Sequence, residues 1–415
     1  MRRRLFYGWY VLGSAFAILF FVQGARSVFG LLFKPIIEEM GWSRGDISAA
    51  VFLNMTVFAL TLTLVGRLFD RYGARRVILT ATLFLGLGHI SIAMVETLWQ
   101  FSLLYGVITA IGFGGTSIPL FAALTTRWFH KHRGVAVSLA LTGGCLGQYL
   151  LVPLVTFLLL WLGWRWVFVL IGLVLLVVNW TLTLWSIRDD PAALGLTPLG
   201  AGESSHSLSG FGQRDHTLGA AMRTSAFWFF MVVMFVCGGG DYLVLLHLVP
   251  MVTDHSIAAE TAAGMLAWFG LLSLIGVLAA GRAIDRLGDK IPLVLTFALR
   301  GLLFLLLIKY QTAAAFYVFA LGFGFTMLIT APVTTTLMGR LFGLTHLGLI
   351  TGVITTVHHL SGGLWAYLGG LFFDQSGDYS LILSLYGIAC LIALVCAVLI
   401  HERPVIEPKA VVSGR

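Results

Sequence analysis

The stretch GRLFDRYGARR at residues 66–76 is repeated as GRAIDRLGDK at residues 281–290. Each copy lies between the second and the third long apolar segment of its own half of the chain. Duplication of a six-segment unit is the simplest account of this spacing, and it predicts a protein of two related halves. The residues that both copies share are Gly66, Arg67, Asp70, Arg71 and Gly73 in the first copy and Gly281, Arg282, Asp285, Arg286 and Gly288 in the second.

The composition indicates a membrane protein. Hydrophobic residues make up 59% of the 415 residues and charged residues only 11%, and the mean hydropathy is +0.95, whereas a soluble domain is about half apolar and about a quarter charged. The net charge of +8 does not indicate a nucleic-acid partner, because the basic residues are placed as topology signals between apolar stretches. The four cysteines lie inside apolar runs without paired spacing, so we expect neither a disulfide framework nor a metal site.

The apolar stretches are long enough to cross a membrane, since a spanning helix needs about 20 apolar residues. We therefore predict an all-α membrane protein with twelve transmembrane helices in two pseudo-symmetric six-helix bundles. The predicted spans are residues 8–32, 46–65, 76–95, 98–122, 133–157, 164–187, 226–250, 260–280, 291–308, 313–336, 347–373 and 379–400.

One long polar stretch divides the chain. It is rich in Gly and Ser and contains Pro191 and Pro198, a composition typical of a flexible linker. The predicted domains are an N-terminal six-helix bundle at residues 1–187, a cytoplasmic linker at 188–223, a C-terminal six-helix bundle at 224–403 and a cytoplasmic tail at 404–415.

Lys and Arg residues are concentrated on one side of the predicted membrane. Apart from two arginines within spans, the opposite side carries only Lys34, Arg44, Arg165 and Lys309. The positive-inside rule places the basic side in the cytoplasm. We expect a multi-pass protein of the cell (inner) membrane, with both termini and the linker cytoplasmic. We also expect it to contact lipid and to function as a monomer.

The repeated stretch, written Gly-x-x-x-Asp-Arg-x-Gly-x-Arg/Lys, resembles the signature loop of the major facilitator superfamily. Further stretches resemble its bacterial monocarboxylate transporter and oxalate:formate antiporter branch: YGWY at residues 7–10, GWSR at 41–44, and WFHKHRG at 128–134 leading into GGCLG at 143–147 and Pro153. This resemblance implies secondary transport of a small organic carboxylate, with a proton or in exchange for another anion, through a site between two rocking halves.

By the same resemblance, the repeated stretch forms a gate that clamps the cytoplasmic side in the outward-open state. The alternative is plain topology marking, which Arg75 and Arg76 satisfy alone, whereas an embedded aspartate needs a further reason. The predicted gate residues are Gly66, Asp70, Arg71, Gly73, Gly281, Asp285, Arg286 and Gly288.

The chain departs from that branch in two spans. The branch commonly has a basic residue in its eighth helix, and the antiporters also have a lysine in the eleventh. Here the span at 260–280 has no charge between its ends, and the eleventh span carries His358 and His359 instead. Adjacent residues point in different directions on a helix, so we expect at most one of these histidines to face a cavity and no two-histidine metal site.

Ionisable residues inside a span cost about a few kcal/mol, so each is a functional candidate. Arg26, in the first span, could hold a carboxylate with its planar guanidinium; alternatively it extends to the interface or pairs with a helix carbonyl. Arg300 lies near the middle of the ninth span, which the resemblance makes peripheral. It is a second substrate-binding candidate, although structural pairing is favoured.

Asp241 is the only acid well inside a predicted span. A carboxylate with little water around it could load and release a proton, so Asp241 is a candidate for proton coupling and for substrate binding. The alternative is a fixed ion pair with Arg26 or Arg300. His247, about two helical turns further along, is a candidate for the same two roles, although a lone intramembrane histidine is more often a packing residue.

The chain has no Gly-Lys-Ser/Thr phosphate loop, no Gly-x-Ser-x-Gly elbow and no His-Glu-x-x-His pair. We therefore predict no cofactor and no enzyme activity. The predicted function is secondary active transport of a small organic anion, a monocarboxylate or a related carboxylate, coupled to protons or working by exchange. The alternatives are an exporter of amphipathic drugs or metabolites and a non-transporting sensor.

Overall fold

The computed structural model describes residues 6–130, 133–200, 216–343 and 345–401. Within these ranges the chain is helical apart from turns and one isolated bridge between Phe129 and Leu199. Eleven segments are long and apolar enough to cross a membrane. One of them, of 53 residues, leaves the helical conformation at Gly163 (φ 73°, ψ 168°) and so contributes two spans. The result is twelve spans in the described part of the chain, and the predicted all-α membrane fold is confirmed.

The first half contributes six spans in the described part of the chain. Its first span is α1 (Gly8–Ser27) continued by α2 (Phe29–Met40). The others are α3 (Arg44–Tyr72), α4 (Ala74–Ile92), the composite of α5 (Leu98–Phe101), η1 (Ser102–Thr109), α6 (Ala110–Gly115) and α7 (Ile118–Trp128), and the two arms of α8 (Arg133–Ser186).

The second half follows two short elements, η2 (Pro191–Leu194) and α9 (Leu218–Ala221). The predicted linker lies partly, and the predicted tail wholly, outside the described residues. The spans of this half are α10 (Ser225–Asp254), α11 (Ala259–Leu287), α12 (Lys290–Lys309), α13 (Ala313–Met327) continued by α14 (Thr330–Phe342), α15 (Leu347–Ser376) and α16 (Ser380–Leu399).

Several helices are longer than the predicted spans. The first span continues to Met40, although its predicted end is residue 32. Helices α3 and α11 have 29 residues each, or about 43 Å at 1.5 Å per residue, which exceeds the roughly 30 Å of a hydrocarbon core. An apolar stretch marks the width of the membrane, whereas the backbone hydrogen bonds of a helix continue into the headgroup region.

This extension corrects the description of the repeated stretch as a loop. Residues 66–72 and 281–287 are helical; the first copy turns at Gly73 (φ 83°) and the second at Gly288 (φ 79°) and Asp289. Glycine suits this left-handed backbone because it has no Cβ. Asp70 and Asp285 therefore lie in the last turns of α3 and α11 and not in the turns themselves.

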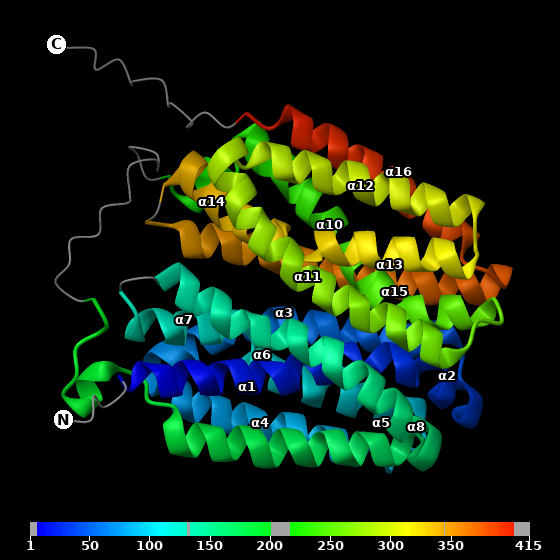
Figure 1. Cartoon of the computed structure of the whole chain (residues 1–415), viewed down its shortest axis with the longest axis horizontal. Coiled ribbons are helices and arrows are strands. Elements are labelled where there is room, and N and C mark those ends of the chain that lie inside the picture. The colour runs from blue at the N-terminus through cyan, green and yellow to red at the C-terminus, as the bar shows by residue number, and fades with distance from the viewer. Residues whose placement is uncertain (1–5, 131–132, 201–215, 344, 402–415) are drawn as a thin grey trace.

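The two halves lie side by side. Figure 1 shows the first half, from blue to green, beside the second half, from green to red, with the start of α1 and the end of α16 toward the same end. We call this the linker end. The opposite end, where α2 leads into α3 through residues 41–43, is the far end.

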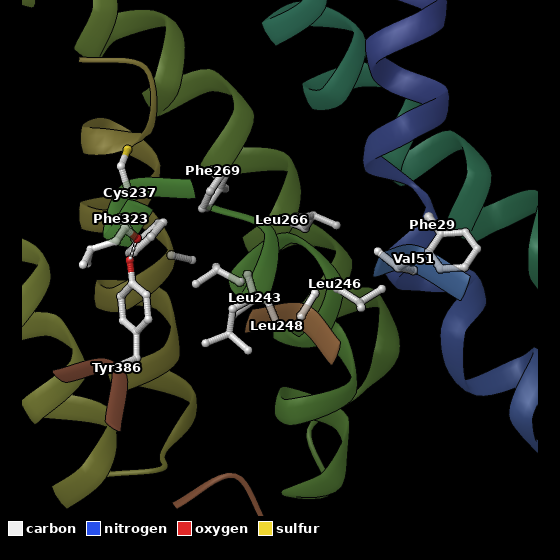
Figure 2. Close-up of a cluster of buried hydrophobic side chains, with 14 of the residues drawn as sticks. Phe29, Val51, Cys237, Leu243, Leu246, Leu248, Leu266, Phe269, Phe323 and Tyr386 are labelled. Carbon is white, nitrogen blue, oxygen red and sulfur yellow. Dashed lines mark hydrogen bonds between the residues drawn. The ribbon is translucent and has the colours of Figure 1, made fainter. Parts of the chain in front are cut away.

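A buried apolar core joins the halves toward the far end. Phe29 and Val51 of the first half belong to one cluster with Leu246 of α10 (Figure 2). A Cβ on Gly30 would lie 2.7 Å from the carbonyl oxygen of Leu245, so the backbones of the two halves approach closely there. The second cluster of buried apolar residues is confined to the first half.

Glycines also set helix distances within each half. A side chain on Gly147 of α8 would overlap the carbonyl oxygen of Phe20 in α1, and one on Gly238 of α10 would overlap that of His358 in α15. Small residues allow such close approach in lipid, where helices gain stability from packing and not from the hydrophobic effect. The contact at Gly238 brings α15 against the segment of α10 that carries Asp241.

Candidate functional site

A cavity of about 260 Å³ lies between the two halves. The first half lines it with residues of α1, α3, α7 and α8, and the second with residues of α10, α11, α13, α14 and α15. Much of the wall is apolar, including Phe58, Leu141 and Val277. Its polar side chains include Gln23, Arg26, Ser27, Ser117, Ser138, Thr142, Gln148, Asp241, Tyr242, Ser273, His358 and His359.

Arg26 is the cavity's cation without an acidic partner in the described part of the chain. Its guanidinium lies over the ring of Phe58 at 4.2 Å and 5.4 Å from the ring centre of Tyr242. Nη2 lies 3.2 Å from the sulfur of Met55, and Nε has no hydrogen-bond partner. The aromatic faces stabilise a cation only partly, because they do not replace the hydrogen bonds of water. An anion in the cavity would supply them.

Local structure explains how Arg26 reaches this position. It lies in the last turn of α1, where the helix dipole favours a positive charge. The regular helix is interrupted at Val28 before α2 begins. Arg26 lines the central cavity, and its Nη2 contacts the sulfur of Met55 and not a helix carbonyl.

Asp241 pairs with Arg300. Nη2 of Arg300 lies 2.8 Å from Oδ1 of Asp241, and the side chains are 0% and 6% exposed. Arg300 also donates to the hydroxyl of Thr326 at 3.1 Å and to the carbonyl of Cys237 at 3.4 Å, and it lies 4.3 Å from the ring centre of Phe323. Asp241 borders the cavity, whereas Arg300 lies behind it.

Both histidines of α15 line the cavity, so the expectation that at most one would do so is wrong. Nε2 of His358 lies 3.8 Å from Oδ2 of Asp241, and Nδ1 of His359 lies 3.1 Å from the hydroxyl of Tyr242. His359 also meets Phe58 edge to face at 4.8 Å. Helix α15 packs against both α10 and α3, so two of its faces border the same cavity.

Cys237, Asp241 and His358 place one ligand atom each within 4.8 Å of one another. The distances suit a metal ion, but the Arg300 guanidinium contacts both the Cys237 sulfur (3.6 Å) and the Asp241 carboxylate (2.8 Å). The guanidinium thus already contacts two of the three ligand residues, and a doubly charged ion bound to the same atoms would lie directly beside it. We therefore do not assign these residues as metal ligands.

His247 lies outside the cavity, in the packed region toward the far end. It is fully buried, with Nδ1 3.0 Å from the Tyr379 hydroxyl and Nε2 2.8 Å from the carbonyl of Ala366. Both ring nitrogens are engaged by the protein itself. In this conformation His247 contacts neither the cavity nor Asp241.

An ion-pair network links the halves at the far end. Arg44 of α3 pairs with Asp254 of α10 through two contacts of 2.8 Å, and Lys34 of α2 reaches the same carboxylate at 2.5 Å. Arg44 also donates to Tyr379 at 2.6 Å, and Asp374 accepts from the backbone nitrogen of Arg44 at 3.1 Å. The sequence analysis did not predict this network. It could have been suspected, because its basic and acidic residues all lie at the ends of spans on the same side of the membrane.

The predicted gate residues lie at the linker end. Asp70 is 79% exposed and meets Arg127 of its own half at 3.4 Å. Arg71 lies 5.2 Å from the ring of Tyr72, while Asp285 and Arg286 are exposed. The ion pair of Asp70 with Arg127 therefore lies within the first half. The role of the predicted gate residues in another conformation stays a prediction.

The fold and the cavity agree with the comparisons to known proteins. The Major Facilitator Superfamily model matches residues 15–272 and 230–414. The chain belongs to the major facilitator superfamily. It is a multi-pass membrane transporter of that family, with similarity to its monocarboxylate transporters.

Two relatives span most of the chain. YcxA, an uncharacterized MFS-type transporter of Bacillus subtilis (strain 168), is 26% identical over 409 residues, which cover 96% of this chain and 94% of that protein. Monocarboxylate transporter 11 of Mus musculus is 27% identical over 387 residues, covering 90% and 83%. The crystal structure of the nucleoside transporter NupG matches with a TM-score of 0.76 at 12% identity, covering 95% and 99%, and supports the fold alone.

Proposed function

We propose that this transporter moves a small organic anion, a monocarboxylate or a related carboxylate, by secondary active transport. The observation that carries the proposal is Arg26, a guanidinium that faces the central cavity without a protein counter-ion among the described residues. Similarity to proteins named monocarboxylate transporters supports the same substrate class.

The charges around the cavity favour an anion with a single charge. Arg300 is neutralised by Asp241, which leaves Arg26 as one uncompensated positive charge when the histidines are neutral. A monocarboxylate matches this charge, and the apolar wall suits its hydrocarbon part. A dicarboxylate would place a second negative charge against that wall.

The conformation supports alternating access. The far end is closed by the apolar core and by the Arg44–Asp254 network, whereas Asp70, Asp285 and Arg286 at the linker end are exposed. We place the linker end in the cytoplasm by the positive-inside rule, which makes this conformation inward-facing. The predicted gate of Asp70, Arg71, Asp285 and Arg286 would then act after the linker end closes.

Replacing Arg44 by alanine is expected to open the far end more often. The change removes contacts to Asp254, Tyr379 and the Phe373 ring, all in the second half. We expect labelling of an introduced cysteine at Ser27, which lines the cavity, by an impermeant reagent from the far side to rise about tenfold, equivalent to ~1.4 kcal/mol across the halves. The parent protein and both variants carry Cys145→Ala, because the native Cys145 lines the same cavity and would also be labelled.

Arg165 provides the matched control. It lies at the same end and pairs with Glu39 at 2.8 Å, but both residues belong to the first half. Arg165→Ala should leave the labelling rate near that of the parent protein. Equal labelling in the Arg44 and Arg165 variants would contradict a gating role for the Arg44–Asp254 network.

The substrate class is tested with purified protein in proteoliposomes. We expect saturable uptake of radiolabelled lactate, pyruvate or benzoate, mutual competition among monocarboxylates, and weaker competition by succinate. Imposing a pH gradient on the same vesicles distinguishes proton coupling from exchange. Absence of uptake and of exchange for every monocarboxylate tested would refute the proposal.

A second candidate is export of an amphipathic compound. The extensive apolar wall of the cavity favours it, as does 24% identity over 360 residues to the Fujikurins efflux protein of Gibberella fujikuroi (strain CBS 195.34 / IMI 58289 / NRRL A-6831). Cells that lack the transporter would then become more sensitive to lipophilic compounds. Changed drug sensitivity without carboxylate transport would favour this second function.

A further inference from the structure

His358 is a cavity histidine that anion binding by Arg26 does not use. Its side chain is 15% exposed, so the ring borders the cavity while most of it is packed. Nε2 lies 3.8 Å from Oδ2 of Asp241. A small approach of the ring would form a hydrogen bond from a protonated imidazole to this carboxylate.

The two oxygens of the Asp241 carboxylate face different partners. Arg300 of α12 contacts Oδ1 at 2.8 Å from the side away from the cavity, while Oδ2 faces His358. In this conformation Arg300 contacts one carboxylate oxygen, and the other is the oxygen that a protonated His358 would contact.

The adjacent histidine has a different electrostatic environment. His359 bonds to Tyr242 and contacts Phe58, and Arg26 lies over both of these rings. A proton on His359 would place a second cation in the surroundings of Arg26. His358 instead faces three groups of α10: Asp241, Cys237 and Tyr242. Arg300 of α12 lies behind Asp241, Arg26 of α1 lies across the cavity, and His359 is the neighbouring ring.

We propose that His358 carries the coupling proton, and that Asp241, held by Arg300, is the carboxylate that stabilises the imidazolium. The proton enters from the water of the cavity on one side of the membrane and returns to water on the other side after the halves have moved. This inference rests on the proposed function as an anion transporter, and it replaces Asp241 and His247 as the predicted proton carriers.

The charge balance supports one proton per monoanion. With neutral histidines, Arg26, Asp241 and Arg300 give the empty site a net charge of +1. A bound monoanion alone would change it to zero, whereas an anion together with a proton on His358 restores +1. The loaded and the empty protein then cross the membrane field with the same charge, and transport is electroneutral.

The transport test compares His358→Gln with His359→Gln in proteoliposomes. Wild type should accumulate substrate about tenfold for one pH unit. His358→Gln should exchange labelled for unlabelled substrate but show no accumulation driven by the gradient. His359→Gln, which changes the binding cavity, should alter KM yet still accumulate substrate. Wild-type accumulation by His358→Gln would overturn the proposal.

A measurement on the wild-type protein covers the case in which the His358 variant does not fold. Protein with ¹⁵N-labelled imidazole rings is titrated between about pH 5.5 and 8 with and without lactate or benzoate. We expect one ring signal to gain a proton more readily when the anion is present. No effect of the anion on any histidine would overturn the proposal, while wild-type transport in vesicles would still support the substrate class.

Discussion

Replacing Arg26 by glutamine is expected to lower the kcat/KM of carboxylate uptake by roughly 30-fold to 1,000-fold. Losing one partner of a desolvated, hydrogen-bonded charge pair costs about 2 to 4 kcal/mol, and each 1.36 kcal/mol is a factor of ten. Glutamine keeps much of the length and polarity but not the positive charge. Initial rates of labelled monocarboxylate uptake over a range of concentrations measure the effect.

Two observations would separate binding from folding in this variant. In the anion-free conformation Arg26 has no counter-ion among the described residues, so Arg26→Gln should unfold at the wild-type temperature or above it. Arg26→Lys keeps the charge but loses the planar fork, and it should retain part of the activity. Uptake by Arg26→Gln at the wild-type rate, in correctly folded protein, would remove Arg26 from the substrate site.

The sequence was informative about Arg26 because the cost of a charge in lipid does not depend on which helix lies nearby. The same argument correctly singled out Asp241 and Arg300 as residues that need a partner. That argument could not show that Asp241 and Arg300 pair with each other. The two residues are 59 positions apart on different helices, so only the packing of those helices brings them together. Of the two possible partners of Asp241, Arg26 and Arg300, the structure shows Arg300.

His358 shows a second limit of the sequence. Helical periodicity gives the angle between adjacent side chains but not the width of the cavity around the helix. Helix α15 contacts both α3 and α10, and so its two histidines face different walls of one cavity. Similarly, hydropathy located the twelve spans but not the helix ends that carry Arg44 and Asp254, because these polar ends lie beyond the apolar stretches.

The other large effect is expected at the buried ion pair. Arg300→Leu leaves the Asp241 carboxylate without its cation, and Asp241→Asn leaves Arg300 uncompensated at 0% exposure. Either change should lower the free energy of unfolding by about 3 to 5 kcal/mol. The double variant removes both charges and should recover most of this loss. Thermal unfolding in detergent, followed by tryptophan fluorescence and size-exclusion chromatography, measures all four proteins.

Transport by the double variant then addresses the role of Asp241. Arg26 is unchanged, so the protein should still exchange one carboxylate for another. His358 has lost the carboxylate that stabilises its charged form, so a pH gradient should no longer drive accumulation. Full accumulation would show that neither Asp241 nor its pairing with His358 is needed. If the double variant is no more stable than Arg300→Leu or Asp241→Asn alone, then loss of the Asp241–Arg300 contact does not explain why these single variants are unstable.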